Sequence, residues 1–134
     1  MKTHINPKSV FNSLQYGFSQ AVSTGNGQRI VLSGQVGVDA DEHTVADDLA
    51  SQTLAAVDNI EKILTKANAK LKDVIIMRIY VVESQRNNQV CIKEMLLDRF
   101  PDDPPVTSWI FVSGLSRAEW LVEIEAEAFV SDSK

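Results

Sequence analysis

Three glutamates alternate with apolar residues near the end of the chain, at positions 123, 125 and 127. A carboxylate that is partly buried in a cleft can have its pKa raised toward neutrality and then act as a general base. Alternate residues of a strand share one face, so the three side chains could also form a solvated strand face. Both interpretations stay open for Glu123, which we place nearest the cleft end of the strand, and Glu123 is our candidate catalytic residue. For Glu125 and Glu127 we favour the solvated face.

The histidines and the cysteine are weaker candidates for chemistry. His4 and His43 lie in a polar terminus and a polar loop, where a solvated imidazole is the simpler interpretation. Cys91 falls on the apolar stripe of an expected helix, which favours a small buried hydrophobe over a nucleophile. It has no cysteine or histidine neighbour at metal-ligand spacing. We therefore expect neither a metal nor any other cofactor.

Familiar catalytic signatures are absent from the sequence. The chain contains no Walker loop and no GxGxxG, HExxH, GxSxG or CxxC motif. Its 44% of hydrophobic and 23% of charged residues are typical of a globular protein. A length of 134 residues fits one domain, so we expect residues 1–134 to form a single domain.

The ends and the charge of the chain bear on its location and partners. The first ten residues, MKTHINPKSV, lack the apolar region of a signal peptide, and the most apolar run, residues 74–82, is short and interrupted by Arg78. A single cysteine cannot form an internal disulfide and suits a reducing compartment. We therefore expect a cytoplasmic protein with no membrane partner. The net charge of −5, without a cluster of lysine and arginine, argues against a nucleic-acid partner.

The first half of the chain predicts a hairpin followed by a long helix. Residues 18–24 and 29–33 are strand-like and are joined by Gly25-Asn26-Gly27, whose residues tolerate positive φ. Apolar residues at helical spacing then predict a helix over residues 46–67. Two aspartates at positions 47 and 48 favour the positive end of its dipole, and Asn68 is a plausible stop.

The second half predicts a strand, a helix and two further strands. Residues 74–82 are short and rich in β-branched side chains, as in a central strand. A helix over residues 86–99 ends before Pro101, and residues 106–112 and 121–130 complete the sheet as a second hairpin. The second helix buries one stripe of side chains: Cys91, Met95, Leu96 and Phe100.

This order of elements predicts an α+β fold in which two helices cover one face of a mixed sheet. The other face is then uncovered, and we assign the apolar side chains of Trp109 and Leu121 to it. An exposed apolar sheet face commonly marks an association surface. We therefore expect a homo-oligomer.

Three segments are informative when they are taken together: Phe18-Ser-Gln-Ala21, Ser33-Gly-Gln35 and Val122-Glu-Ile-Glu-Ala126. As a set they resemble the RidA/YjgF family of reactive-intermediate (enamine/imine) deaminases. Between them, the helix with Gln52, Leu54, Asn59 and Leu64, and the strand from Asp73-Val74 to Val82, fit the same family in order and spacing. The resemblance covers nearly the whole chain. It implies a chorismate-mutase-like α+β fold and a homotrimer with clefts between its subunits.

The resemblance also implies where a ligand lies. Deaminase-active members have in their cleft a tyrosine before the Ser-Gln-Ala element, an arginine two residues after a proline, and the first glutamate of the C-terminal VEIEA. In this chain these positions are occupied by Phe18, Thr107 and Glu123, while Ser33 and Gly34 match the loop that lines the cleft. The family's arginine is therefore a threonine here, and its tyrosine is a phenylalanine.

The missing arginine decides the activity that we expect. A guanidinium grips a substrate carboxylate bidentately while ordered water attacks the imine carbon. Removing the positive partner of a desolvated carboxylate costs roughly 2–5 kcal/mol or more. Arg99 and Arg117 are candidates for a relocated cation, although exposed surface arginines are the simpler interpretation. Trp109, on the same strand as Thr107, completes our set of ligand-binding residues.

We therefore expect a RidA/YjgF-like homotrimer that binds a small, neutral or weakly acidic metabolite in the intersubunit cleft, with weak or no 2-imino acid deaminase activity. The alternative is a hydrolase that acts on an imine, enamine or related C–N bond of a substrate without a carboxylate, with Glu123 positioning water. A ribonuclease role has been attached to parts of this family, and the charge of −5 argues against it here. A structural or chaperone-like role would also suit an exposed apolar groove.

Overall fold

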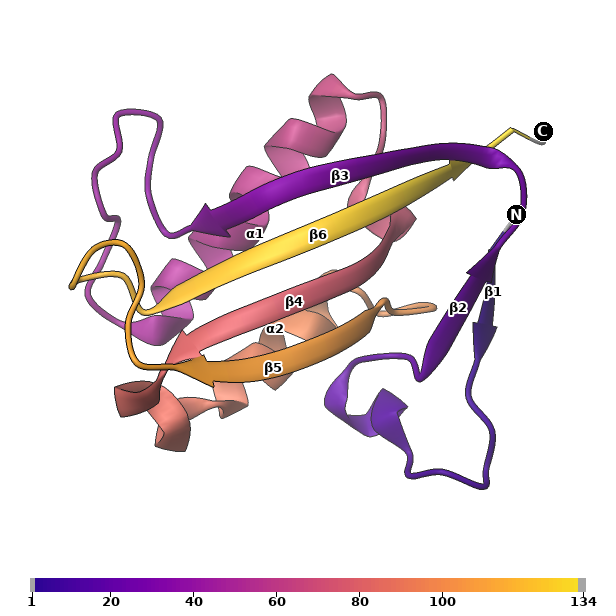
Figure 1. The fold of residues 1–134 in the computed structure, drawn as a ribbon, viewed down its shortest axis with the longest axis horizontal. Helices are drawn as coiled ribbons and strands as arrows, with labels where there is room; N and C mark the ends of the chain where they lie inside the picture. The colour runs from indigo at the N-terminus through magenta and orange to yellow at the C-terminus, as the bar shows by residue number, and fades with distance from the viewer. Residues whose placement is uncertain (1, 133–134) are drawn as a thin grey trace.

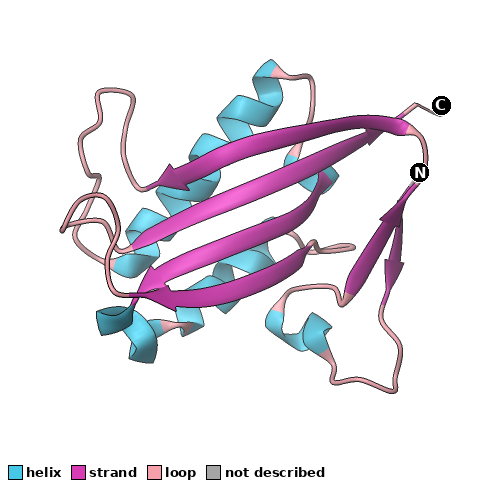
Figure 2. Ribbon diagram, in the orientation of Figure 1, coloured by secondary structure: helices cyan, strands magenta, loops and turns pink. Residues whose placement is uncertain are grey.

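Four strands form a mixed sheet with two helices on one face, and a short two-stranded hairpin lies beside it (Figure 1). This is the arrangement in a computed structural model, which describes residues 2–132. The strands are β1 (Lys2–Ile5), β2 (Ala21–Thr24), β3 (Gly27–Val36), β4 (Val74–Val82), β5 (Val106–Val112) and β6 (Val122–Ser131). The helices are α1 (Leu49–Lys66) and α2 (Val90–Arg99), with short 3₁₀ turns η1 (Ser13–Tyr16), η2 (Leu71–Asp73) and η3 (Glu83–Asn88) (Figure 2). The α+β class expected from the sequence is confirmed.

The strands of the sheet lie in the order β3-β6-β4-β5. β6 runs antiparallel to both of its neighbours, whereas β4 and β5 are parallel. Parallel neighbours need a crossover connection, and η3 with α2 supplies it between β4 and β5. The predicted hairpin of residues 106–112 with 121–130 is therefore wrong, because β4 lies between β5 and β6.

The first predicted hairpin is also wrong. β2 pairs with β1, and β3 pairs with β6 on both sides of a register shift between Leu32 and Gln35. A tight two-residue turn would need positive φ at its central residues, and Asn26 is not among the non-glycine residues that adopt it. The partner of β2 is the polar strand at the start of the chain, Lys2–Ile5, which was not predicted as a strand.

Helix α1 agrees with its prediction within a few residues. It begins after Asp48, whose carboxylate accepts a hydrogen bond from the Ser51 backbone nitrogen at 2.8 Å. That hydrogen bond holds the pKa of Asp48 below its usual range. Asn68, with φ of 61°, adopts the left-handed conformation just beyond the helix, as expected of a stop. The residues of α1 that are buried against the sheet are Leu49, Gln52, Thr53, Ala56, Val57, Ile60 and Leu64.

Helix α2 starts later than predicted, because the 3₁₀ turn η3 occupies residues 83–88. Met95, Leu96 and Phe100 are buried as expected, whereas Cys91 is only partly buried. Both helices lie behind the sheet in Figure 1, so the near face of the sheet has no helix over it. Among residues 2–132, no helix has the length and apolar character needed to cross a membrane.

The two faces of the sheet are separated by the alternation of β6. Its even-numbered residues Val122, Ile124, Ala126 and Ala128 are buried under the helices, and its three glutamates lie on the open face. The assignment of Trp109 and Leu121 to the open face is wrong. Trp109 is paired in register with the buried Ile79. The side chains of Trp109 and Leu121 both pack against the core. The exposed apolar residues of the open face are instead Val31, 64% exposed, and Ile110, 38% exposed.

Candidate functional site

Thr107 lies on β5, on the face of the sheet that carries the helices. Its register partner Met77 is fully buried on that face, while Thr107 itself, at the sheet edge, is partly exposed. The indole nitrogen Nε1 of Trp109, two residues along the strand, donates a hydrogen bond to Thr107 Oγ1 over 3.1 Å. The strand thus presents a hydroxyl next to an indole, with no charge of its own.

Phe18 packs against this pair from the N-terminal segment. Its ring centroid lies 6.1 Å from that of Trp109 at an interplanar angle of 59°. The next residue ties the segment to the start of β5, because Ser19 donates from its backbone nitrogen to Pro105 O at 2.9 Å and from its hydroxyl to Pro104 O. Three of the predicted ligand-binding residues, Phe18, Thr107 and Trp109, are therefore brought together.

Ser33, Gly34 and Glu123 form a second group, on the adjacent strands β3 and β6, whereas Thr107 lies on β5 at the opposite edge of the sheet. The β3–β6 register shifts between Leu32 and Gln35, so Ser33 and Gly34 lie at a β-bulge. A Cβ atom on Gly34 would lie 2.1 Å from Glu123 Oε2. Only glycine leaves room there for the carboxylate in its present position.

Two side-chain amides, one fully buried and one partly buried, fix the chain around this second group. Gln52, fully buried in α1, accepts from Leu121 N at 2.9 Å and donates to Ala46 O and Glu119 O, which holds the loop that leads into β6. Asn59 donates to the carbonyls of Val36 and Val38 at the end of β3. These hydrogen bonds give partners to backbone groups in partly buried surroundings.

The two groups do not meet within one chain. Glu123 is paired with Tyr80 of β4, and Tyr80 with Ile110 of β5, so Thr107 lies three residues farther along the strand direction. At about 3.3 Å per residue this is about 10 Å, and the two side chains also point to opposite faces of the sheet. A cleft that contains both would need residues from more than one chain.

Comparison with known proteins places this fold and these segments in a family. Residues 12–130 match the family model described as Endoribonuclease L-PSP. The chain belongs to the RidA/YjgF family. It is 31% identical over 113 residues to a RutC family protein of Pyrococcus abyssi. The match covers 84% of this chain and 85% of that protein.

Solved structures of the RidA/YjgF family agree. The Rid family protein YyfB of Yersinia pestis, itself described as of unknown function, is 34% identical with a TM-score of 0.91, and the match covers 96% of this chain and 98% of that one. A YjgF/YER057c/UK114 family member from Mycobacterium tuberculosis is 33% identical with a TM-score of 0.65, covering 97% and 100% of the two chains. The family expected from the three sequence segments is confirmed.

The arginines that we considered as replacements for the family's cation have other partners. Arg99 Nη1 lies 2.9 Å from Asp58 Oδ1, and its Nε lies 3.5 Å from Asp98 Oδ2. The guanidinium of Arg117 stacks over the ring of Trp120 at 5.5 Å. Neither contact is with the group around Thr107.

A third arginine, Arg86, which no sequence motif marks, lies on the same face as Thr107. Arg86 is 4.3 Å from the ring centroid of Phe111, four residues along β5. Both oxygens of Glu83 accept hydrogen bonds from it, at 2.6 and 2.9 Å. Its charge is thus already matched by a carboxylate.

The other two glutamates of β6 are paired across the open face. Glu127 lies 2.8 Å from Arg29 and 3.5 Å from Arg78, and Glu125 lies 3.8 Å from Arg78. Tyr80 donates from its hydroxyl to Glu125 at 2.9 Å, and this hydrogen bond raises the pKa of Tyr80. These contacts are those of a polar strand face rather than of a free general base.

The histidines and the cysteine lie away from both groups or at their margin. His43 is exposed in a loop beside Asp39 and Asp41. One nitrogen or oxygen atom of each of these three side chains lies within 4.8 Å of the other two, close enough to hold a cation. The backbone N–H of His43 lowers the pKa of Asp39 by donating to its carboxylate. His4 Nδ1 contacts Ser19 Oγ at 3.1 Å. Burial raises the pKa of the Cys91 thiol, which disfavours its reactive thiolate form.

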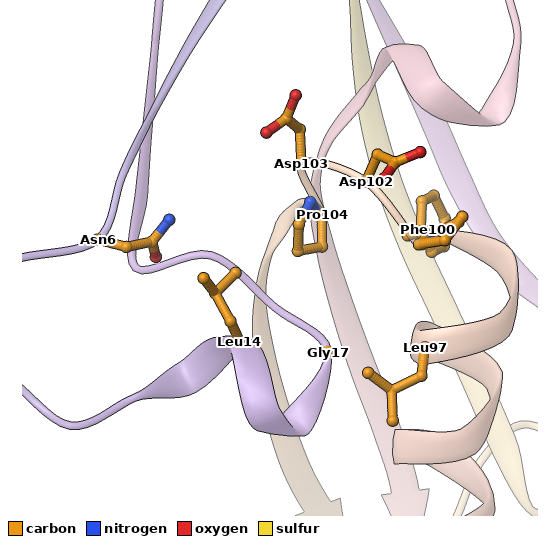
Figure 3. A pocket seen from close by; sticks show the side chains of 9 residues that line it. Asn6, Leu14, Gly17, Leu97, Phe100, Asp102, Asp103 and Pro104 are labelled. Carbon is orange, nitrogen blue, oxygen red and sulfur yellow. The ribbon is translucent and has the colours of Figure 1, made fainter.

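Two pockets of about 530 Å³ each are lined by residues of the segment 6–17. The first, shown in Figure 3, separates this segment from the end of α2 and from the acidic turn that precedes β5. Its lining is Asn6, Leu14, Gly17, Leu97, Phe100, Pro101, Asp102, Asp103 and Pro104. The second lies within the segment itself and is lined by residues 6–8 and 10–14. Thr107 and Glu123 line neither pocket.

Proposed function

We propose that the chain is a homotrimer that binds a small, neutral or weakly acidic metabolite between its subunits and has weak or no activity on 2-imino acids. The observation that carries this proposal is Thr107, a neutral side chain hydrogen-bonded to Trp109. The family resemblance puts a carboxylate-binding arginine at that position. A threonine hydroxyl offers one hydrogen bond and no charge, where a guanidinium would offer a bidentate ion pair.

The surroundings of Thr107 support the loss of carboxylate binding. Phe18 stands where the family has a tyrosine, so the ring is retained and its hydroxyl is lost. Arg99 and Arg86 are paired with Asp58 and Glu83, and moving either guanidinium would break an existing ion pair. A substrate carboxylate would therefore lose its hydration without gaining a charged partner.

The proposed assembly follows from the separation of the two residue groups. Glu123 and Thr107 lie on opposite faces of one sheet, so a shared cleft takes Thr107 from one subunit and Glu123 from another. The open sheet face, with Val31 and Ile110 exposed among paired charges, is suited to contact with another copy. Three copies are what the family resemblance implies.

Two measurements test this proposal. In the first, the purified protein is mixed with an enzyme that generates 2-iminobutanoate, and ammonia release is compared with that given by an arginine-bearing family member. We expect the rate to stay near that of the buffer alone, and acceleration like that of the arginine-bearing protein would refute the proposal. In the second, sedimentation equilibrium should give three times the mass of one chain, and a monomer would remove the intersubunit cleft.

A second candidate is a hydrolase for an imine, enamine or related C–N bond in a substrate without a carboxylate. It is favoured by the room that Gly34 leaves for the Glu123 carboxylate, which could position an attacking water. Substitution Glu123→Gln should then abolish turnover and leave the assembly intact. Glu125→Gln is the matched control, because its carboxylate is engaged by Tyr80.

The description of the matched family model names an endoribonuclease, which raises nucleic acid as a ligand. This chain carries a charge of −5, and two glutamates of its open face neutralise the arginines beside them. Phosphate backbones bind through unpaired lysine and arginine side chains, and their binding weakens as salt rises. We therefore expect no RNA binding even at low ionic strength.

A further inference from the structure

The segment between β1 and β2 exposes several large apolar side chains close together. Phe11 is 61% exposed, and Val10, Leu14 and Tyr16 are each more than 40% exposed. Single exposed apolar residues are normal in soluble proteins, but four within seven residues form a patch of the kind that marks a binding surface. The feature therefore needs an explanation other than chance exposure.

The backbone of this segment is held in place by side-chain hydrogen bonds. Gln20, at the start of β2, donates from its backbone nitrogen to Asn6 Oδ1 and from Nε2 to the carbonyl of Phe11, both at 2.8 Å. Gln15 Nε2 donates to Asn12 O at 2.9 Å. Phe11 is thus presented to solvent by an anchored backbone, and this preorganisation lowers the entropic cost of binding a ligand against its ring.

Three aromatic rings connect Phe11 to Thr107. The ring of Phe11 meets that of Phe18 edge to face, with centroids 6.3 Å apart and an interplanar angle of 69°. Phe18 meets Trp109 at 6.1 Å, and Trp109 donates to Thr107 Oγ1. Because the rings are not stacked in parallel, they leave faces and edges available to a further ring. We call Phe11, Phe18 and Trp109 the aromatic row.

The polar end of the aromatic row is a donor. The indole N–H occupies a lone pair of the Thr107 hydroxyl, which leaves the hydroxyl hydrogen to be donated to an acceptor on a ligand.

We propose that the aromatic row binds a planar, uncharged aromatic or heteroaromatic ring that carries a hydrogen-bond acceptor for Thr107. This inference rests on the proposed function, since it names the class of ligand that the cleft takes in place of a 2-imino acid. Recognition comes from ring-to-ring contacts with Phe11 and Phe18 and from one hydrogen bond. The family's guanidinium–carboxylate pair has no part in it.

The test uses benzamide as the probe, because it joins a planar ring to an uncharged acceptor. Cyclohexanecarboxamide has the same amide on a puckered, non-aromatic ring, and benzoate has the same ring with a charge. Titrations of the full-length protein are followed through the indole N–H resonance of Trp109 in ¹H–¹⁵N NMR spectra, which Trp120→Phe distinguishes from the other indole. We expect benzamide to bind at least about fivefold more tightly than either comparison compound.

Variants in the segment distinguish recognition of an aromatic ring from non-specific hydrophobic binding. Phe11→Leu keeps an apolar side chain and removes the ring, and it should weaken benzamide binding about fivefold. Tyr16→Leu is the matched control, because it removes an exposed ring of the same segment that lies outside the aromatic row, and it should leave binding unchanged. The proposal is overturned if the two amides bind equally or if Phe11→Leu has no effect.

The assembly provides the remaining outcome. If Phe11→Leu lowers the number of copies in the oligomer while benzamide binding stays the same, the patch is a contact between copies and the ring proposal is wrong. Failure of ring binding is separable from failure of the proposed function. If only the ring proposal is wrong, benzamide does not bind and 2-iminobutanoate deamination stays near the buffer rate. If the proposed function is wrong, deamination is rapid whether or not benzamide binds.

Discussion

The indole nitrogen of Trp109 donates a hydrogen bond to the hydroxyl of Thr107, 3.1 Å away on the same face of β5. The pair defines the polar character of this part of the family fold, because the hydroxyl is oriented by the indole and neither group carries a charge. Substitution Thr107→Val keeps the shape of the side chain and removes the acceptor.

We expect Thr107→Val to lower the free energy of unfolding by about 1 kcal/mol, the usual net value of one such hydrogen bond. Urea unfolding measures it, and Ser108→Ala, an exposed change on the opposite face, is the control. Equal stability of Thr107→Val and the wild type would mean that the indole finds water as readily as the hydroxyl.

Gly34 and Glu123 make a second pair that a double-mutant cycle can test. Gly34→Ala places a Cβ 2.1 Å from Glu123 Oε2, so the carboxylate must move or the strands must shift. Overpacking of this kind typically costs about 1–3 kcal/mol. The cost should largely vanish in a Glu123→Ala background, whereas additive effects of the two changes would show that they do not interact.

Gln52 is expected to dominate the stability of the loop before β6. Gln52→Leu removes the fully buried side chain that partners three partly buried backbone groups, Leu121 N, Ala46 O and Glu119 O. An unsatisfied buried group costs about 1–3 kcal/mol, so urea unfolding should show a loss of at least about 2 kcal/mol. Gln28→Leu, an exposed change on β3, should stay within about 0.5 kcal/mol of the wild type. Similar losses for both variants would contradict the role of Gln52.

The cap of α1 makes a pH-dependent contribution to stability. The Ser51 N–H lowers the folded-state pKa of Asp48, so this contribution is present above the unfolded value, near 3.8, and is lost as the pH falls through the lower folded value. Asp48→Asn retains an acceptor without a charge. The stability advantage of the wild type over Asp48→Asn should therefore shrink as the pH is lowered from 7 to below 4.

The matched control for the cap is Asp47→Asn, one residue outside the capping position. Its difference from the wild type should change less over the same range of pH. An advantage of wild type over Asp48→Asn that is independent of pH would show that the charge of Asp48 does not contribute to the cap.

The sequence predicted the regular elements whose residues alternate or repeat strongly. Residues 74–82 and the helix with Ile60 and Leu64 on its buried stripe were placed almost correctly, because one face of each must be apolar. Pairing between strands was less predictable. The polar segment Lys2–Ile5 resembles an irregular chain terminus, yet it pairs with β2. β3 therefore pairs with β6 instead of with β2.

Trp109 was assigned to the wrong face because β5 has no clear alternation. Val106, Ile110 and Val112 are apolar as well as Trp109 and Phe111, so the pattern does not indicate which side chains face the helices. A shift of one residue moves every side chain to the other face. Phe11 was missed for a different reason. No periodicity marks an exposed aromatic residue in a loop, and its contact with Phe18 depends on the folded chain.

The proposed lack of 2-imino acid deaminase activity depends most on the absence of a carboxylate-binding cation beside Thr107. One comparison tests the effect of that absence directly. Deamination of 2-iminobutanoate is measured for the wild type and for Thr107→Arg in the same coupled assay. Restoring the guanidinium should raise the rate at least about tenfold over a wild type that stays near the buffer rate, since the missing ion pair corresponds to about 2–5 kcal/mol. A wild type that already deaminates as fast as Thr107→Arg would contradict the account.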